Sequence, residues 1–241
     1  MWTALPYLSD HKMSHIKKTY LLAVMRTLFS FSSSWADMLL GLEQNSPRIY
    51  SLDVLTHKID LVSTVDRKLN VIEFSPQGIL YGYDKAIKTL YTVDLKTGTL
   101  TPVGNMDPSF DVLTFHENGL LLGYEKAKNS LYRIEPETAK TSFIASVDKP
   151  FYQMAFSPNG ILFGYDTQTN HLYKIDIVSG QTTQISKISQ HLNTIEFSPN
   201  GILFGYDNAT TQLYRIDLDR GNVILINHFK TPFQSMTFSQ N

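Results

Sequence analysis

The chain has 241 residues, of which 42% are hydrophobic, 12% aromatic and only 18% charged. This composition supplies enough apolar surface for a folded core and excludes an intrinsically disordered chain. The formal net charge of −1 gives no basic footprint for nucleic acid, so we expect no nucleic-acid partner. The absence of cysteine excludes disulfides, cysteine-ligated zinc, iron–sulfur clusters and a cysteine nucleophile.

The first 36 residues differ in character from the rest of the chain. From Met13 onward, a short basic start is followed by an apolar stretch and then by small residues that end at Ala36. This order is typical of a secretory signal peptide, so residues 1–36 are predicted to be one, with its true start at Met13 and cleavage before Asp37. Because Arg26 interrupts the apolar stretch, an amphipathic helix packed on the domain is the alternative. No membrane span is expected, since the uncharged run is far shorter than the ~20 residues that crossing requires.

Internal repeats occupy the remainder of the chain. The string Phe-Ser-Pro-Asn-Gly-Ile-Leu-Phe-Gly-Tyr-Asp stands unchanged at 156–166 and at 197–207, and looser copies stand at 74–84 and 115–125. The glycine of its turn recurs every 41 residues, and a second motif, Leu-Tyr-x-Ile-Asp, keeps the same spacing. A fifth copy lies at the N-terminal end of the region. Residues 37–241 therefore divide into five repeats of 41 residues without insertion or deletion.

Each repeat predicts four short β-strands. In the repeat at 150–190, the candidate strands are 150–157, 161–166, 171–177 and 181–187. The Ser-Pro-Asn-Gly and Ser-Gly sequences between strands are typical of tight turns, because proline presets φ and glycine accepts a positive φ. Four strands in about 40 residues is the period of a propeller blade. The predicted fold is therefore all-β, a five-bladed β-propeller over residues 37–241.

The two ends of the repeated region complement each other. The region begins at the second strand of a repeat, whereas segment 232–241 matches the first strand of the others. We expect the C-terminal strand to complete the first blade, which closes the ring and removes an exposed strand edge. The alternative is an open β-solenoid. Solenoids need capping repeats with polar outer faces, and the first and last units here are as apolar as the middle ones.

The repeats resemble known propeller families. The Phe-Ser-Pro-Asn-Gly and Leu-Tyr-x-Ile-Asp motifs resemble WD-repeat and related bacterial propeller repeats, with Val93 and Asp94 where a WD repeat has Trp-Asp. The stretch 90–98 also resembles a pyrroloquinoline-quinone-type repeat, although that repeat's blade-docking tryptophan is missing. In architecture the five units resemble the five-bladed tachylectin-type lectins. These resemblances imply the fold, and they imply no single function because such blades occur in enzymes, scaffolds and binding proteins.

One repeat position changes its residue between repeats and yet stays polar. It lies at the start of the first strand of each repeat and holds Asn70, Asp111, Tyr152, Asn193 and Gln234. In the WD-repeat geometry that strand lines the central channel, so the resemblance places these side chains around one mouth of the channel. Oxygen ligands of this kind suit calcium, and gluconolactonase-type propellers hold a divalent metal at the same place. We expect a ligand-binding site at this mouth, with calcium as the one cofactor considered; a solvated polar entrance is the alternative.

Other polar residues recur through the repeats. Two sets of acidic residues follow the second and third strands, and we expect them to bind backbone N–H groups at turns. A ring of carboxylates that binds a cation or sugar hydroxyls is the alternative. They are Glu43, Asp84, Glu125, Asp166 and Asp207, and Asp53, Asp94, Glu135, Asp176 and Asp217. Glu73 and Glu196 share one position on the first strand, which suggests a carboxylate pair for glycoside hydrolysis. Their blades are not adjacent, so such a pair has to reach across the channel.

The sequence favours an exported protein, secreted or periplasmic, that acts as a binding or interaction module. The near-identity of the repeats supports this reading, because an enzyme needs one asymmetric site. A metal-dependent lactonase or hydrolase at the channel mouth and a purely structural surface protein are the alternatives. The expected partner is a small polar ligand, a glycan or a protein, and we expect a monomer.

Overall fold

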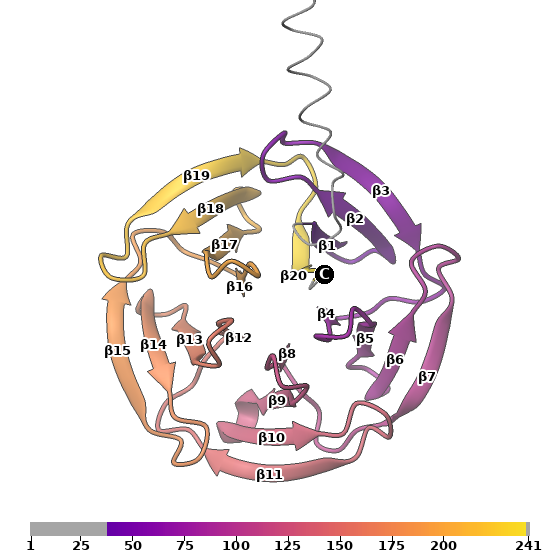
Figure 1. Ribbon diagram of the computed structural model, residues 1–241, viewed down its shortest axis with the longest axis horizontal. Coiled ribbons are helices and arrows are strands. Elements are labelled where there is room, and N and C mark those ends of the chain that lie inside the picture. Colours follow the sequence, from indigo (N-terminus) through magenta and orange to yellow (C-terminus); the bar gives the residue numbers. More distant parts are fainter. Residues whose placement is uncertain (1–37, 240–241) are drawn as a thin grey trace, which may run out of the picture. The chain divides into compact units, whose positions relative to one another are not determined.

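The computed structural model describes residues 38–239, and the predicted signal peptide lies outside these residues. The described residues form five antiparallel sheets of four strands each, arranged in a ring (Figure 1). The prediction of a closed five-bladed β-propeller is confirmed, and the open solenoid is wrong. Strand bounds for the first and second blades are β20 (Phe233–Phe238), β1 (Leu39–Glu43), β2 (Arg48–Leu52) and β3 (Ile59–Thr64), then β4 (Val71–Phe74), β5 (Leu80–Asp84), β6 (Thr89–Val93) and β7 (Leu100–Asn105).

The remaining three blades repeat the same plan with little variation in strand length. The third consists of β8 (Val112–Phe115), β9 (Leu121–Glu125), β10 (Ser130–Ile134) and β11 (Thr141–Ser146). The fourth consists of β12 (Gln153–Phe156), β13 (Leu162–Asp166), β14 (His171–Ile175) and β15 (Thr182–Lys187). The fifth consists of β16 (Thr194–Phe197), β17 (Leu203–Asp207), β18 (Gln212–Ile216) and β19 (Val223–His228). In every blade the first strand lies innermost and the fourth forms the rim (Figure 1).

The C-terminal strand closes the ring as predicted. Strand β20 pairs antiparallel with β1, with Leu39 opposite Phe238 and Leu42 opposite Ser235. Hydroxyls of β20 also reach the next blade, since Thr237 Oγ1 accepts a hydrogen bond from the Phe74 N–H at 3.1 Å. The first blade is thus built from both ends of the repeated region.

The apolar core lies between the blades. The described residues form five buried clusters, and each joins side chains from two neighbouring blades. The Gly-Tyr pair of the second strand explains much of this packing. A Cβ placed on Gly164 would stand 2.7 Å from the Phe151 ring, so glycine is needed for that ring to lie on the strand. The neighbouring tyrosine ties blades together: Tyr124 Oη accepts the Phe151 N–H at 3.1 Å, and Tyr206 Oη accepts the Phe233 N–H at 3.3 Å.

The recurring acidic residues have mostly architectural roles. Asp176 Oδ1 accepts the N–H groups of Val178 and Ser179, both at 2.9 Å, and Asp53, Asp94 and Asp217 cap their turns in the same way. The N–H groups of Ser179 and Val178 lower the pKa of Asp176. In the set that follows the second strand, the two glutamates form ion pairs: Glu43 with Arg48 at 2.5 Å and Glu125 with Lys128 at 3.0 Å.

Candidate functional site

Four of the five predicted mouth residues directly precede an innermost strand, Gln234 lies within β20, and each of the five has an intramolecular partner. Asn70 Oδ1 accepts the Lys85 N–H at 2.8 Å, and Asn193 Oδ1 accepts the Asn208 N–H at 2.9 Å. These bonds join two segments of the same blade. Both asparagine side chains therefore have a structural role, because their oxygens accept backbone N–H groups.

The other three mouth residues make contacts between or within blades that the sequence did not reveal. Asp111 accepts the Lys126 N–H at 2.9 Å and the Lys85 ammonium at 2.7 Å. The Lys126 ammonium stands 3.2 Å from the centre of the Tyr152 ring. Gln234 Nε2 donates to the Leu69 carbonyl at 2.6 Å. Two of the predicted mouth residues, Asp111 and Tyr152, are therefore in contact with lysines.

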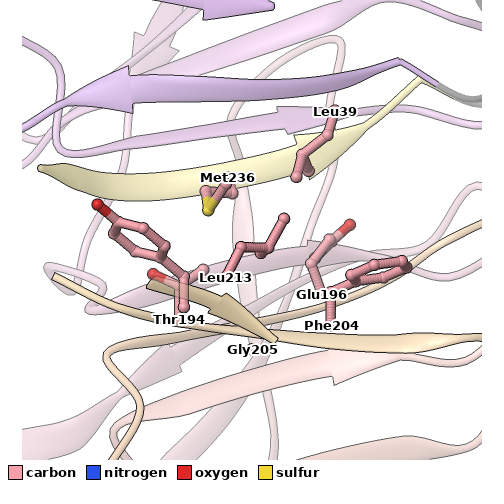
Figure 2. A pocket seen from close by; sticks show the side chains of 8 residues that line it. Leu39, Thr194, Glu196, Phe204, Gly205, Leu213 and Met236 are labelled. Atoms are coloured by element: carbon pink, nitrogen blue, oxygen red, sulfur yellow. The ribbon is translucent and has the colours of Figure 1, made fainter. Parts of the chain in front are cut away.

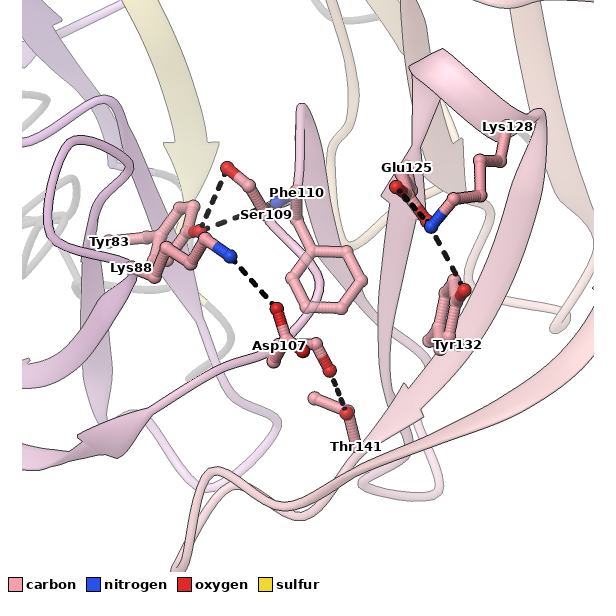
Figure 3. A network of polar contacts seen from close by, with 9 residues as sticks. All are labelled: Tyr83, Lys88, Asp107, Ser109, Phe110, Glu125, Lys128, Tyr132 and Thr141. Carbon is pink, nitrogen blue, oxygen red and sulfur yellow. Dashed lines mark hydrogen bonds and ion pairs between the residues drawn. The ribbon is translucent and has the colours of Figure 1, made fainter.

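Two aspartates in the loops that precede the innermost strands, Asp107 and Asp148, also have side-chain partners. Asp107 Oδ1 accepts the Lys88 ammonium at 2.8 Å, beside Ser109 and Tyr83 (Figure 3). Asp148 Oδ1 accepts the Thr182 hydroxyl at 2.8 Å. Within residues 38–239, no group of three or more histidine, aspartate and glutamate side chains is arranged to hold a metal ion. Calcium at the mouth stays a prediction.

Glu73 and Glu196 are buried at the inner ring, with 6% and 9% of their surfaces exposed. Glu73 Oε1 accepts the Phe115 N–H of the next blade at 3.1 Å. Burial raises the pKa of Glu73 to about 8, and burial together with the charge of Glu73 raises the pKa of Glu196 well above its ordinary value. The two side chains thus interact although their blades are not adjacent. Glu196 lies between its own blade and β20, where the space it shares with Leu39 and Met236 has no room for a water molecule (Figure 2). Two carboxyls buried in this way, away from an open substrate cleft, do not fit glycoside hydrolysis.

A candidate binding site is a groove between the fourth and fifth blades, with a volume of about 450 Å³. We call it the inter-blade groove. It lies where the β12–β13 and β16–β17 turns face each other, next to the β18–β19 turn. Its lining residues are Ser157, Pro158, Asn159, Ile161, Phe163, Lys174, Ile185, Phe197, Pro199, Asn200, Gly201, Leu218 and Asp219.

The groove combines an apolar floor with a polar rim. The Phe163 and Phe197 rings lie 5.1 Å apart and are tilted by 49°. On the rim, the hydroxyl of Ser157 bonds Asn159 Oδ1 at 2.5 Å, and the equivalent bond to Asn200 Oδ1 measures 2.6 Å. Since the amide oxygens take these bonds, both amide NH₂ groups remain as donors. Lys174 and Asp219 have no ion-pair partner among the residues that the structure describes.

His116 accounts for the difference between this groove and the inter-blade space before it. In the third blade, His116 occupies the position that Ser157 holds in the fourth. The His116 ring packs edge-on against Phe156 at 5.0 Å, and its Nε2 would stand only 2.5 Å from a Cβ on Gly160. A Cβ on Gly201, the equivalent glycine of the open groove, meets nothing within 4 Å. The imidazole therefore fills one inter-blade space, and serine leaves the next one empty.

The comparisons with known proteins agree with this fold. A family described as "Repeat of unknown function (DUF6923)" matches residues 150–238, from the fourth blade to the closing strand. A chain in the crystal structure of a nidogen/laminin complex is similar, with a TM-score of 0.61 and 11% identity over 85% of this chain and 99% of that chain. This chain is a repeat β-propeller protein.

A second solved structure resembles this propeller less well. It is a selenomethionine-substituted virginiamycin B lyase from Staphylococcus aureus, with a TM-score of 0.48 and 16% identity over 83% of this chain and 73% of that chain. At these identities the likeness concerns the fold alone. No curated protein matches the propeller sequence. No helix among residues 38–239 has the length and apolar character needed to cross a bilayer.

Proposed function

We propose that this propeller is a binding module that takes a small amphiphilic molecule in the inter-blade groove. The observation that carries the proposal is the open space beside Ser157, which His116 fills in the preceding pair of blades. A volume of about 450 Å³ lies within the range of small-molecule sites, which are mostly apolar with a few placed polar groups.

The lining indicates the chemistry of the ligand. The rings of Phe163 and Phe197 suit an aromatic or aliphatic body. Two amide NH₂ groups and the Lys174 ammonium can donate hydrogen bonds from the rim, so a carbonyl or carboxylate head suits them. The hydroxyl of Ser157 is used within its own turn, where it bonds the Ile161 carbonyl at 3.0 Å. Its hydrogen bonds run to Asn159 and Ile161 of that turn and not to Lys174 or Asp219, which favours binding over catalysis.

The proposal includes export. The signal-type sequence of residues 1–36 supports a secreted or periplasmic protein. Mass spectrometry of the protein purified from its source tests this part, because cleavage before Asp37 removes residues 1–36. Recovery of a cytoplasmic protein that retains residues 13–36 would contradict export and leave the groove unaffected.

The groove is tested by filling it. Ligand-observed NMR with benzoate, phenylacetate and phenylacetamide should detect binding to the full chain. Ser157→His should abolish that binding, because the imidazole has room in the equivalent turn of the third blade. Ser75→His, the same change at the same repeat position between the second and third blades, is the matched control and should leave binding unchanged. Equal binding by wild type and Ser157→His would overturn the proposal.

A further inference from the structure

The rim of the propeller consists of the fourth strands β3, β7, β11, β15 and β19, each with one edge unpaired by its own sheet (Figure 1). An unpaired edge presents backbone N–H and C=O groups that can pair with another strand. Native proteins block such edges with charges, polar side chains or proline.

The second and third residues of each rim strand differ in polarity between blades. They are Asp60-Leu61, Thr101-Pro102, Ser142-Phe143, Thr183-Gln184 and Ile224-Leu225. Four of the five rim strands place a charged or polar residue first in this pair, and β7 adds a proline that cannot donate a hydrogen bond. Only β19 has two apolar residues there.

Both faces of β19 are apolar at its exposed edge. Leu225 lies opposite Tyr214 and Ile224 opposite Arg215, so the two side chains follow the strand alternation and point to opposite faces of the blade. Ile224 is 62% exposed and Leu225 52% exposed. Val223 and Ile226 extend the apolar run on either side. A strand that covers this edge must therefore be apolar on both of its own faces.

Strand β19 itself meets that requirement, and its two ends differ in charge. The turn before it carries the carboxylates of Asp217 and Asp219 together with Arg220, whereas Lys230 follows it. Neither Asp219 nor Lys230 has an ion-pair partner among residues 38–239. Antiparallel pairing about a two-fold axis places the acidic end of one copy beside the basic end of the other, and the contact closes after two copies.

We propose that β19 pairs antiparallel with β19 of a second copy of this chain, so that the protein is a two-fold homodimer joined at the rims of the fifth blades. The inference does not rest on the inter-blade groove, which opens at the turns, whereas the dimer contact uses the strand edge; Asp219 is the one residue that takes part in both. It differs from the sequence-based expectation of a monomer.

Sedimentation velocity of the full chain over a range of concentrations tests the dimer. Wild type should shift from monomer to dimer, and I224T/L225Q, which gives β19 the residues of β15, should raise the dimer dissociation constant by at least about tenfold. The matched control L61Q/F143Q removes exposed apolar residues from two other rim strands and should leave the dissociation constant unchanged.

Three results would overturn the proposal: a wild-type protein that stays monomeric, oligomers larger than a dimer, or loss of the dimer in the control. Binding of a monomeric wild type to a synthetic peptide with the sequence of residues 221–230 would also overturn it, in favour of an extended segment from another protein. Circular dichroism verifies the fold of I224T/L225Q. If that variant fails to fold, Ile224→Lys alone should still prevent association, because it places a charge on the contact.

Discussion

The buried carboxyls of Glu73 and Glu196 interact from opposite sides of β20, the strand that closes the ring. The Thr237 side chain on β20 lowers the pKa of Glu73, and the backbone N–H of Phe238 on the same strand lowers that of Glu196, but burial outweighs both. Burial raises the pKa of both groups, and each carboxylate charge disfavours the other. The pair therefore links the protonation of the inner ring to closure of the propeller.

This link predicts how stability depends on pH. The folded protein holds a proton on Glu73 up to about pH 8, whereas an ordinary glutamate releases it near 4.5. The stabilisation is thus fully present below pH 4.5 and is lost as the pH rises towards 8. We expect the melting temperature of wild type to fall over this interval relative to that of E73Q/E196Q, whose neutral amides do not titrate. Thermal unfolding of both proteins across the interval measures the difference.

The exposed carboxyl of Glu117 provides the control for this measurement. Glu117→Gln also removes one titrating group, but from the surface. Its melting temperature should follow that of wild type at every pH. Parallel pH profiles for wild type and E73Q/E196Q would show that the buried pair does not contribute.

Removal of the closing strand should abolish cooperative folding. Deletion of residues 231–241 exposes the edge of β1 and uncovers the buried side chains of Leu39 and Leu42. We expect aggregation of the truncated protein, measured by light scattering. Phe238→Ala is a milder test of the same contact. That ring is 1% exposed, so its loss should cost about 3–5 kcal/mol in chemical denaturation. A soluble truncation that unfolds cooperatively would contradict the prediction.

Substitution of the glycine in a Gly-Tyr pair should lower the stability of the folded protein. The Cβ of Gly164→Ala would overlap Phe151 and Ile175, each at 2.7 Å, in a fully packed core. Overpacking of this kind costs about 1–3 kcal/mol. Tyr124→Phe provides a comparison, because it removes only the hydroxyl that accepts the Phe151 N–H and should cost about 1 kcal/mol. Urea denaturation measures both values. Unchanged stability in Gly164→Ala would show that the ring can move aside.

The fold could be predicted because its signals are local and repeated. Each turn has its own glycine, and each strand has its own apolar pattern. The first repeat lacks a first strand of its own, and the C-terminal segment has the sequence of one. Ring closure can therefore be inferred without any knowledge of packing. Such signals can be recognised in a single sequence because the same pattern recurs in every repeat.

The candidate sites could be predicted only in part, because they depend on contacts between repeats. The difference between His116 and Ser157 is visible in the sequence, but its effect depends on the space above Gly160 and Gly201. Lys85 lies 26 residues before Asp111 and reaches it from the neighbouring blade. The position shared by Glu73 and Glu196 is equally visible, whereas their interaction depends on how closely the innermost strands approach.

The asparagines at the channel mouth should matter for stability. Asn193→Ala leaves the Asn208 N–H without the acceptor that it meets at 2.9 Å. A loss of about 1 kcal/mol is expected, which lowers the melting temperature by about 2–4 °C for a domain of this size. Differential scanning calorimetry without added ligand measures it. Ligand affinity in the inter-blade groove should be unchanged in Asn193→Ala. A lower affinity would mean that the groove and the predicted mouth site are coupled.

Calcium at the mouth, which the oxygen-bearing side chains predict, can be tested through Lys85. An ion that binds only the folded protein raises the melting temperature by mass action. Because the Lys85 ammonium bonds Asp111 Oδ1 at 2.7 Å, a cation must displace it to reach that carboxylate. We therefore expect calcium to raise the melting temperature slightly in wild type and more strongly in Lys85→Gln. The triple variant that also carries Asp111→Ala and Asn193→Ala should show no rise in melting temperature. Equal melting temperatures with and without calcium in all three proteins would rule out a calcium site here and leave the mouth residues with their backbone contacts alone.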